Sequence, residues 1–184
     1  MKSVFQYGSN CNKERLNSPY RLNGAAKPKC KAQTTEGFEI AFDVWSQKNN
    51  CAAADLVRGG QQKAWGVLYE VPDEKINGPN PTDGSKTLSQ IEGRNYECQH
   101  IDVEIGGQVK SAVTFLVKRA SRTSKLATSA QYVCHIIKGL RDFDVPDDYI
   151  QHVIDVAIKN VESAAQSAAS EKPALERLRT PPPG

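Results

Sequence analysis

Two segments of the chain carry residue types that suit chemistry on a small anionic group. The first is 4–12, in which a short apolar run leads directly into Tyr7-Gly8-Ser9-Asn10. A glycine beside small polar residues permits a tight turn whose backbone N–H groups converge on one point, and such a turn binds a carboxylate or an oxyanion. An ordinary turn from a strand into a loop has the same composition, so the segment alone leaves both interpretations open.

The second segment is Ser89-Gln90-Ile91-Glu92-Gly93, at the expected end of a short helix. A carboxylate beside the apolar Ile91 is placed to be half buried, and burial raises the pKa of a carboxyl. A group with such a pKa is suited to general acid–base work near neutral pH. A solvated glutamate before a glycine at a helix end is the commoner alternative.

Other chemistries have less support in the sequence. The histidines His100, His135 and His152 are far apart, and no Cys-x-x-Cys occurs, so we predict no metal site. Cys134 precedes His135, but successive residues on a helix do not face each other. Ser9 is not in a Gly-x-Ser-x-Gly elbow. The sequence also lacks a Walker loop and a Gly-x-Gly-x-x-Gly motif.

Alternation of apolar and polar residues predicts the strands that position these segments. We expect strands near 38–45, 52–57, 65–71, 96–105 and 109–117. Arg58–Gln62 is expected to turn the chain between the second and third of them. Gly106-Gly107 is expected to form a two-residue hairpin turn between the last two.

Three segments have sequence patterns typical of helices. A short helix is expected over about 85–91, with Thr87 and Gln90 at capping-box spacing and Gly93 just beyond its end. Longer amphipathic helices are expected near 130–140 and 146–163. Strands followed by helices predict an α+β fold with one mostly antiparallel, curved sheet or small barrel, outside which the helices pack.

Length and composition define the class of protein. The 184 residues suit one domain, which we place at 1–165, followed by a flexible tail at 166–184. A net charge of +3 is too small to indicate a nucleic-acid or membrane partner. The longest nearly apolar run, 112–117, is far shorter than a membrane-spanning helix. Five scattered cysteines are typical of a reducing compartment, so we expect a cytoplasmic protein.

Several motifs, taken in order, carry a resemblance to a known family. They are Tyr7-Gly8-Ser9-Asn10, Trp65-Gly66-Val67-Leu68-Tyr69, Glu92-Gly93, Tyr96, Ser129-Ala130-Gln131-Tyr132, Gly139 and Pro146-Asp147-Asp148-Tyr149. Their order and spacing over about 3–160 resemble the gamma-glutamylcyclotransferase-like family, which includes the AIG2-like proteins and the gamma-glutamylamine cyclotransferases. Each motif alone is weak, and together they indicate the family without indicating the substrate.

The resemblance implies a small, mostly antiparallel β-barrel flanked by helices and enclosing one cavity. It implies that Tyr7, Gly8, Ser9 and Asn10 hold a gamma-glutamyl group, that Glu92 is the acid and base, and that Tyr132 lines the pocket. The implied reaction is attack of the substrate's α-amine on its own γ-carbonyl, which yields 5-oxoproline and a free amine or amino acid. The implied partner is thus a small gamma-glutamyl molecule, with no metal or organic cofactor; the number of subunits is left open.

Two departures from the family pattern concern the rim of the pocket. Only Arg94-Asn95 separates Gly93 from Tyr96, a shorter link than in the enzymes of the family, and the segment 20–36 matches poorly. We expect both to shape the rim and so the choice of substrate.

An alternative function is a non-catalytic domain of the same fold that holds a carboxylated metabolite, since a fold does not fix a function. Retention of Glu92 favours the enzyme, because a binder of anions gains nothing from a buried carboxylate. A basic adaptor that uses the lysines of 27–31 has little support.

Overall fold

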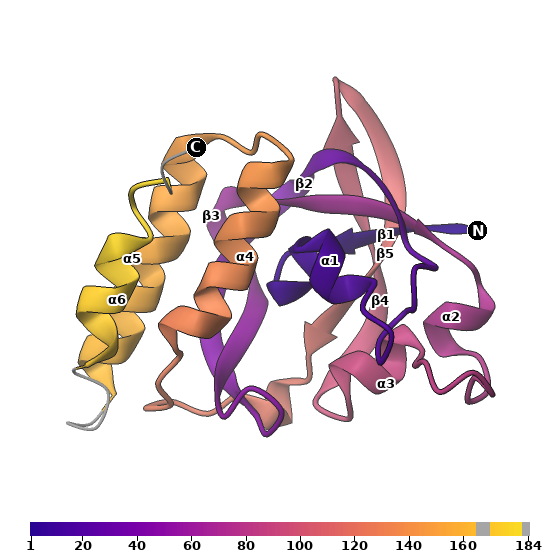
Figure 1. Ribbon diagram of the computed structural model, residues 1–184. Helices are drawn as coiled ribbons and strands as arrows, with labels where there is room; N and C mark the ends of the chain where they lie inside the picture. Colours follow the sequence, from indigo (N-terminus) through magenta and orange to yellow (C-terminus); the bar gives the residue numbers. More distant parts are fainter. Residues whose placement is uncertain (165–169, 182–184) are drawn as a thin grey trace.

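The computed structural model describes residues 1–164 and 170–181. Its centre is a closed barrel of five strands in the order β1-β3-β2-β4-β5 (Figure 1). The strands are β1 (Lys2–Gln6), β2 (Lys27–Ser46), β3 (Cys51–Val71), β4 (Tyr96–Ile105) and β5 (Gln108–Val117). Pairing is antiparallel except where β1 meets β5 at Val4 and Val113. The predicted α+β fold with a small, mostly antiparallel barrel is confirmed.

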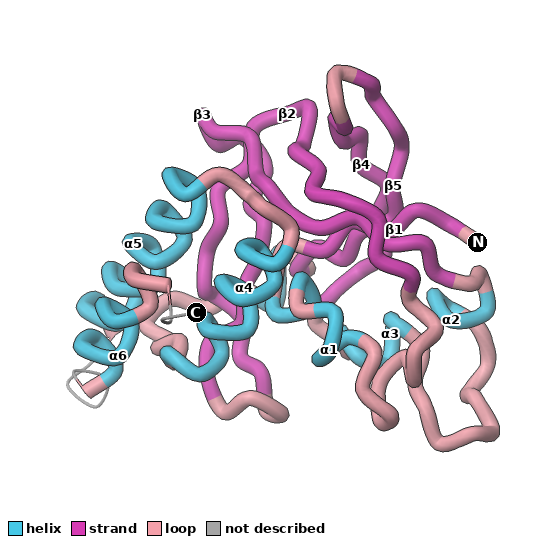
Figure 2. The backbone as a smooth tube through the Cα atoms, turned by 45° about the horizontal axis from the view of Figure 1, so that its top comes forward, coloured by secondary structure: helices cyan, strands magenta, loops and turns pink. Residues whose placement is uncertain are grey.

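The barrel is split at one end because β2 and β3 are much longer than their neighbours. β1 pairs with β3 only over 67–71, and β4 pairs with β2 only at Gln33 and Thr34. The rest of the β2–β3 hairpin continues past the other strands to its own turn (Figure 2). Over 51–66, β3 therefore has a strand partner on one side only among the described residues.

The predicted turn at Arg58–Gln62 is wrong, because β3 runs continuously through it. Its residues form a bulge opposite Gly37 and Phe38, where the register of the two strands shifts. Gly59 has φ +90°, and a Cβ built on Gly60 would lie 2.5 Å from the Phe38 carbonyl carbon. The glycine pair thus allows the two strands to approach closely at a bulge. A glycine pair is equally typical of a chain reversal, so the composition does not distinguish the two. The start of β2, over 27–37, was not predicted.

The predicted turn between the last two strands and the predicted ends of the short helix before them are confirmed. Gly106 and Gly107 both have positive φ and connect β4 to β5 in a two-residue turn. Thr87 and Gln90 form the capping box of α3 (Leu88–Glu92), and Gly93 ends that helix at φ +83°. The remaining helices are η1 (Ser9–Cys11), α1 (Lys13–Leu16), α2 (Glu74–Asn77), η2 (Arg119–Ser121), α4 (Ala130–Asp142), α5 (Asp147–Ser163) and α6 (Glu171–Arg177).

The helices form two groups outside the barrel. Helices α4, α5 and α6 lie together on one side of it, and α2 and α3 lie on the other (Figure 1). Part of the segment predicted as a flexible tail is the helix α6, whose Leu175 is fully buried. Arg141 of α4 also donates to the carbonyls of Leu178 and Arg179, so residues 171–179 are tied to the domain. Residues 165–169 and 182–184 of the predicted boundary and tail lie outside the described residues, and the division itself stays a prediction.

Helix α4 approaches the loop after β1 unusually closely at Gly139. A Cβ built there would lie 2.2 Å from the carbonyl carbon of Cys11, a backbone atom with no room to move. Gly139 therefore sets the distance between α4, which carries Tyr132, and the turn that contains Ser9 and Asn10.

We predict that Gly139→Ala lowers the free energy of unfolding by about 1–3 kcal/mol, because the added methyl group forces α4 away from Cys11. Urea unfolding followed by circular dichroism measures it. Cys134→Ala, at an exposed position of the same helix, is the control and should change the value by less than about 0.5 kcal/mol. An unchanged urea midpoint for Gly139→Ala would show that the packing of Gly139 against the Cys11 backbone leaves room for a methyl group.

Candidate functional site

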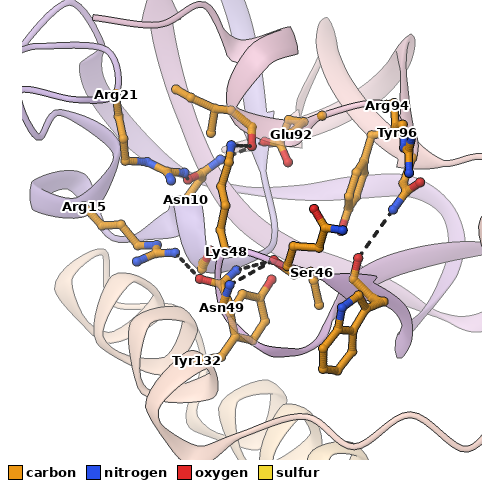
Figure 3. A pocket seen from close by; sticks show the side chains of 17 residues that line it. Asn10, Arg15, Arg21, Ser46, Lys48, Asn49, Glu92, Arg94, Tyr96 and Tyr132 are labelled. Carbon is orange, nitrogen blue, oxygen red and sulfur yellow. Dashed lines mark hydrogen bonds between the residues drawn. The ribbon is translucent and has the colours of Figure 1, made fainter.

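A cavity of about 380 Å³ opens at the split end of the barrel (Figure 3). Its walls come from η1, α1, the loop after α1, the β2–β3 turn, α3, the start of β4 and α4. The polar side chains that line it include Ser9, Asn10, Arg15, Arg21, Ser46, Lys48, Asn49, Glu92, Arg94, Asn95, Tyr96 and Tyr132. A chamber of about 20 Å³, room for about one water molecule, shares Ser9, Asn10, Glu92, Tyr96 and Tyr132 with the cavity and reaches Tyr7 and Gly8.

All six site residues predicted from the sequence therefore line the chamber, and Ser9, Asn10, Glu92 and Tyr132 also line the cavity beside it. Glu92 and Asn10 are in direct contact, because Asn10 Nδ2 donates to Glu92 Oε1 at 2.7 Å. Tyr132 comes from α4, on the other side of the cavity (Figure 3). Residues from positions 7–10, 92 and 132 of the sequence are thus brought together around a space that fits a small molecule.

Glu92 is the last residue of α3, where the turn at Gly93 directs the chain into β4. Burial raises the pKa of Glu92, and the opposing influences are, in order, the charge of Arg21, the hydrogen bond from Asn10, and the charges of Lys48 and Arg15. Lys48 Nζ also donates to the carbonyls of Gln90 and Ile91, at 3.1 and 3.2 Å, at the C-terminal end of α3. Glu92 is therefore a desolvated carboxylate stabilised by cations, which suits a proton acceptor.

The loop after β1 forms the single turn η1. The Cys11 N–H donates to the Gly8 carbonyl at 2.9 Å, whereas the N–H groups of Gly8, Ser9 and Asn10 donate to no backbone carbonyl within 1–164 and 170–181. These three donors are therefore not used in strand pairing. Their convergence on a substrate oxygen stays a prediction.

Two tyrosines of the site hydrogen-bond the unpaired edge of β3 at Ala54. The Tyr132 hydroxyl accepts from the Ala54 N–H at 3.1 Å, and the Tyr96 hydroxyl donates to the Ala54 carbonyl at 2.8 Å. Burial raises the pKa of Tyr132 to about 12, so it keeps its proton at neutral pH. Because that hydroxyl accepts from Ala54, its own proton remains available to a molecule in the cavity.

The cations of the cavity were largely missed by the sequence analysis. Arg15, Arg21, Lys48 and Arg94 come from four different segments, and no spacing rule connects them. Of the two segments that depart from the family pattern, Arg21 of 20–36 and both Arg94 and Asn95 line the cavity, and their effect on the choice of substrate stays a prediction. The Nε atoms of Arg15 and Arg21 are buried and have no hydrogen-bond partner among the described residues. The cavity thus has buried donors that suit an anionic ligand.

The described residues contain neither a cluster typical of a metal site nor a helix typical of a membrane span. No group of three or more His, Cys, Asp or Glu side chains lies together there in an arrangement able to hold a metal ion. No helix in the same part of the chain is long and apolar enough to cross a membrane.

The closed five-stranded barrel flanked by helices is the fold of a structure described as gamma-glutamyl cyclotransferase, and here it carries a half-buried carboxylate, Glu92, beside a small-residue turn. The family model for gamma-glutamyl cyclotransferase, AIG2-like, matches residues 4–134. The chain belongs to this family, and its membership indicates gamma-glutamyl cyclotransferase-like activity. No curated protein matches the chain significantly.

Solved structures show the same fold at low sequence identity. The chain is similar to a structure described as gamma-glutamyl cyclotransferase, with a TM-score of 0.71, 17% identity and 97% of each chain covered. It is equally similar to an uncharacterized human protein, with a TM-score of 0.71, 19% identity and 97% of each chain covered. YkqA from Bacillus subtilis matches with a TM-score of 0.63 and 20% identity, over 85% of this chain and 54% of YkqA.

We predict that Glu92→Gln increases the free energy of unfolding near neutral pH. Because burial raises the folded-state pKa of Glu92 above its unfolded value, the ionised carboxylate disfavours the folded state above that pKa. The difference between variant and parent should shrink as the pH falls and Glu92 is protonated in both states. Urea unfolding across pH measures it, and Glu39→Gln, at an exposed position, is the control. A variant less stable than the parent near neutral pH would contradict this account.

Proposed function

We propose that this protein is a gamma-glutamyl cyclotransferase that converts a gamma-glutamyl amino acid into 5-oxoproline and the free amino acid. The observation that carries the proposal is that Glu92 and the turn of Gly8, Ser9 and Asn10 line the same small cavity. Among the described residues, Glu92 is the one carboxylate that lines this chamber, and it meets the need of the reaction for a base; the turn supplies donors for substrate oxygens.

The reaction is a closure of the substrate on itself. The α-amine nitrogen attacks the γ-carbonyl carbon, a new C–N bond closes the five-membered ring, and the bond from that carbon to the leaving nitrogen breaks. Glu92 accepts one proton from the α-ammonium group before the attack and returns it to the leaving nitrogen. The attacking nitrogen loses its second proton as the ring closes, and the released amine takes this proton up through water, so the protein ends unchanged. General acid–base catalysis of this kind contributes ~10²–10⁴-fold.

The cavity also orients the substrate. The free N–H groups of Gly8, Ser9 and Asn10 are available to a carboxylate or to the oxyanion that forms at the γ-carbonyl, where each donor is worth ~10²–10³-fold. The Tyr132 hydroxyl provides a further donor. Enclosure folds the flexible chain toward ring closure and so lowers the entropic part of the barrier.

The charge of the cavity favours a leaving group with a carboxylate. Of the described residues, four cations, Arg15, Arg21, Lys48 and Arg94, and one carboxylate, Glu92, line it. A gamma-glutamyl amino acid brings two carboxylates and one ammonium group, whereas a gamma-glutamyl derivative of a simple amine brings one of each. The excess of positive charge therefore complements the amino-acid derivative better.

We predict that the protein releases 5-oxoproline from gamma-glutamyl amino acids and that Glu92→Gln lowers kcat ~10²–10⁴-fold. The amide keeps the shape of the side chain and cannot accept the proton, so binding of 5-oxoproline, measured by calorimetry, should persist. The assay uses gamma-glutamyl amino acids, gamma-glutamyl amines and glutathione, with chromatography of 5-oxoproline.

Two results would count against this proposal. Equal rates for parent and Glu92→Gln would remove Glu92 from the mechanism. Binding of a panel member without turnover by the parent would support the non-catalytic binding domain instead.

We predict that Arg15→Gln raises KM about tenfold for a gamma-glutamyl amino acid and leaves KM for a gamma-glutamyl amine within about twofold. Loss of one charge-assisted hydrogen bond to the leaving carboxylate accounts for a change of this size. Steady-state kinetics with the matched pair gamma-glutamylalanine and gamma-glutamylethylamine measures it. An equal rise for both substrates would assign Arg15 to another part of the substrate.

A further inference from the structure

A chain of hydrogen bonds connects Arg21 to Glu92 through Asn10. The Arg21 guanidinium donates to Asn10 Oδ1, and Asn10 Nδ2 donates to Glu92 Oε1 at 2.7 Å. Asn10 is buried, with 4% of its surface exposed, so solvent does not compete for its amide. Figure 3 shows the three side chains converging along one wall of the cavity.

The direction of these bonds is fixed by chemistry. A side-chain amide has a donor end and an acceptor end, and a carboxylate accepts from the first while a protonated carboxyl can donate to the second. Arg21 has donors only, so it must face Asn10 Oδ1. The amide then presents its NH₂ group to Glu92, which favours the ionised carboxylate over the protonated one.

We propose that Arg21 is a positioning residue for Glu92 that acts through Asn10, holding the Asn10 amide so that Glu92 stays an oriented, ionised base. The inference rests on the proposed function, because it assigns Arg21 a part in that reaction. Arg21 itself does not touch Glu92 in the chain of bonds, and this separates its role from that of a direct ion pair.

The backbone around Arg21 connects its loop to the segment that leads into α3. The Lys86 N–H donates to the Arg21 carbonyl at 2.7 Å, and Lys86 directly precedes Thr87, the N-cap of α3. The next residue, Leu22, is fully buried. The loop of Arg21 and the helix of Glu92 are therefore held together independently of the side chains, so a change at Arg21 leaves its backbone anchored.

Several charged and titratable groups surround Glu92 from the elements packed against it. They are Arg15 of α1, Arg21 of the loop after α1, Lys48 of the β2–β3 turn, Tyr7 after β1, Tyr96 of β4 and Tyr132 of α4. Arg21 is the strongest of the influences that lower the pKa of Glu92. Loss of Arg21 should therefore raise that pKa, so that the base becomes protonated at a higher pH.

The test compares the pH dependence of kcat/KM for the parent, Arg21→Met and Arg21→Lys. We expect Arg21→Met to lower kcat/KM roughly tenfold more at about pH 6 than at about pH 8, because the acidic limb of the profile moves to higher pH. Arg21→Lys keeps a charged donor and should recover most of the loss. Arg15→Met removes a weaker influence on the pKa of Glu92 and has no link to Asn10, so its losses at the two pH values should differ much less than those of Arg21→Met.

The role of Asn10 is tested by a double-mutant cycle. If Arg21 acts through Asn10, the effect of Arg21→Met on the profile should shrink at least threefold in an Asn10→Ala background. Effects that add independently would show that Arg21 acts through its charge alone, and they would overturn the proposal. An unshifted profile for Arg21→Met would overturn it as well.

Carbon-13 NMR titration of the Glu92 carboxyl provides a readout that does not need turnover. Its titration should move to higher pH in Arg21→Met and return toward the parent in Arg21→Lys. The move should shrink at least threefold in an Asn10→Ala background, because the charge of Arg21 alone would shift the titration equally with and without Asn10. A parent that makes no 5-oxoproline would defeat the proposed function and leave this titration as the test of the link between Arg21 and Glu92. An unchanged titration in an active enzyme would defeat the inference alone.

Discussion

The unpaired edge of β3 at the split end of the barrel is the constraint on which the site depends. A buried N–H or carbonyl without a partner costs free energy, so this edge must be satisfied by something other than a strand. The Ala52 N–H donates to the Ala127 carbonyl at 2.8 Å, and the Ala52 carbonyl accepts from Thr128 Oγ1 at 2.9 Å. Two residues further on, Ala54 binds the hydroxyls of Tyr132 and Tyr96. The segment before α4 and the first residue of β4 thus take the place of a missing strand, and the cavity is the space left beside them.

This arrangement explains why side chains of the site also stabilise the fold. Tyr132 and Tyr96 line the cavity and at the same time satisfy the backbone of β3, so their rings have little freedom. Next to them Asp55, fully buried, accepts from the Val117 N–H at 3.1 Å and from Arg122 Nε at 2.7 Å, and so joins β3 to the end of β5. Rigid walls of this kind orient a flexible substrate without loss of side-chain entropy on binding.

Local structure could be predicted from the sequence where it depends on one short segment. The Gly106-Gly107 turn, the capping box of Thr87 and Gln90, and the stripe of α5 depend on neighbours within a few residues, and all are found in the structure. The bulge at Gly59-Gly60 was mistaken for a reversal, since the residues that decide between the two lie on β2. Local residue types marked Tyr7–Asn10 and Glu92 as candidates and left ordinary alternatives open, and the resemblance over most of the chain then favoured them and added Tyr132.

The cations of the cavity show why the rest of the site could not be predicted from the sequence. A lysine or arginine in a polar segment has the same local sequence whether it faces solvent or an enclosed carboxylate. Arg21, Arg15 and Lys48 come to line a cavity with Glu92 only when the chain folds. The fold then places α1, the loop after it and the β2–β3 turn around that carboxylate. Their burial is unfavourable on its own, since desolvation lowers the pKa of all three. Ionised Glu92 offsets this cost in part, and an anionic substrate would offset it further. The same charges that stabilise ionised Glu92 therefore also favour an anionic ligand in the cavity.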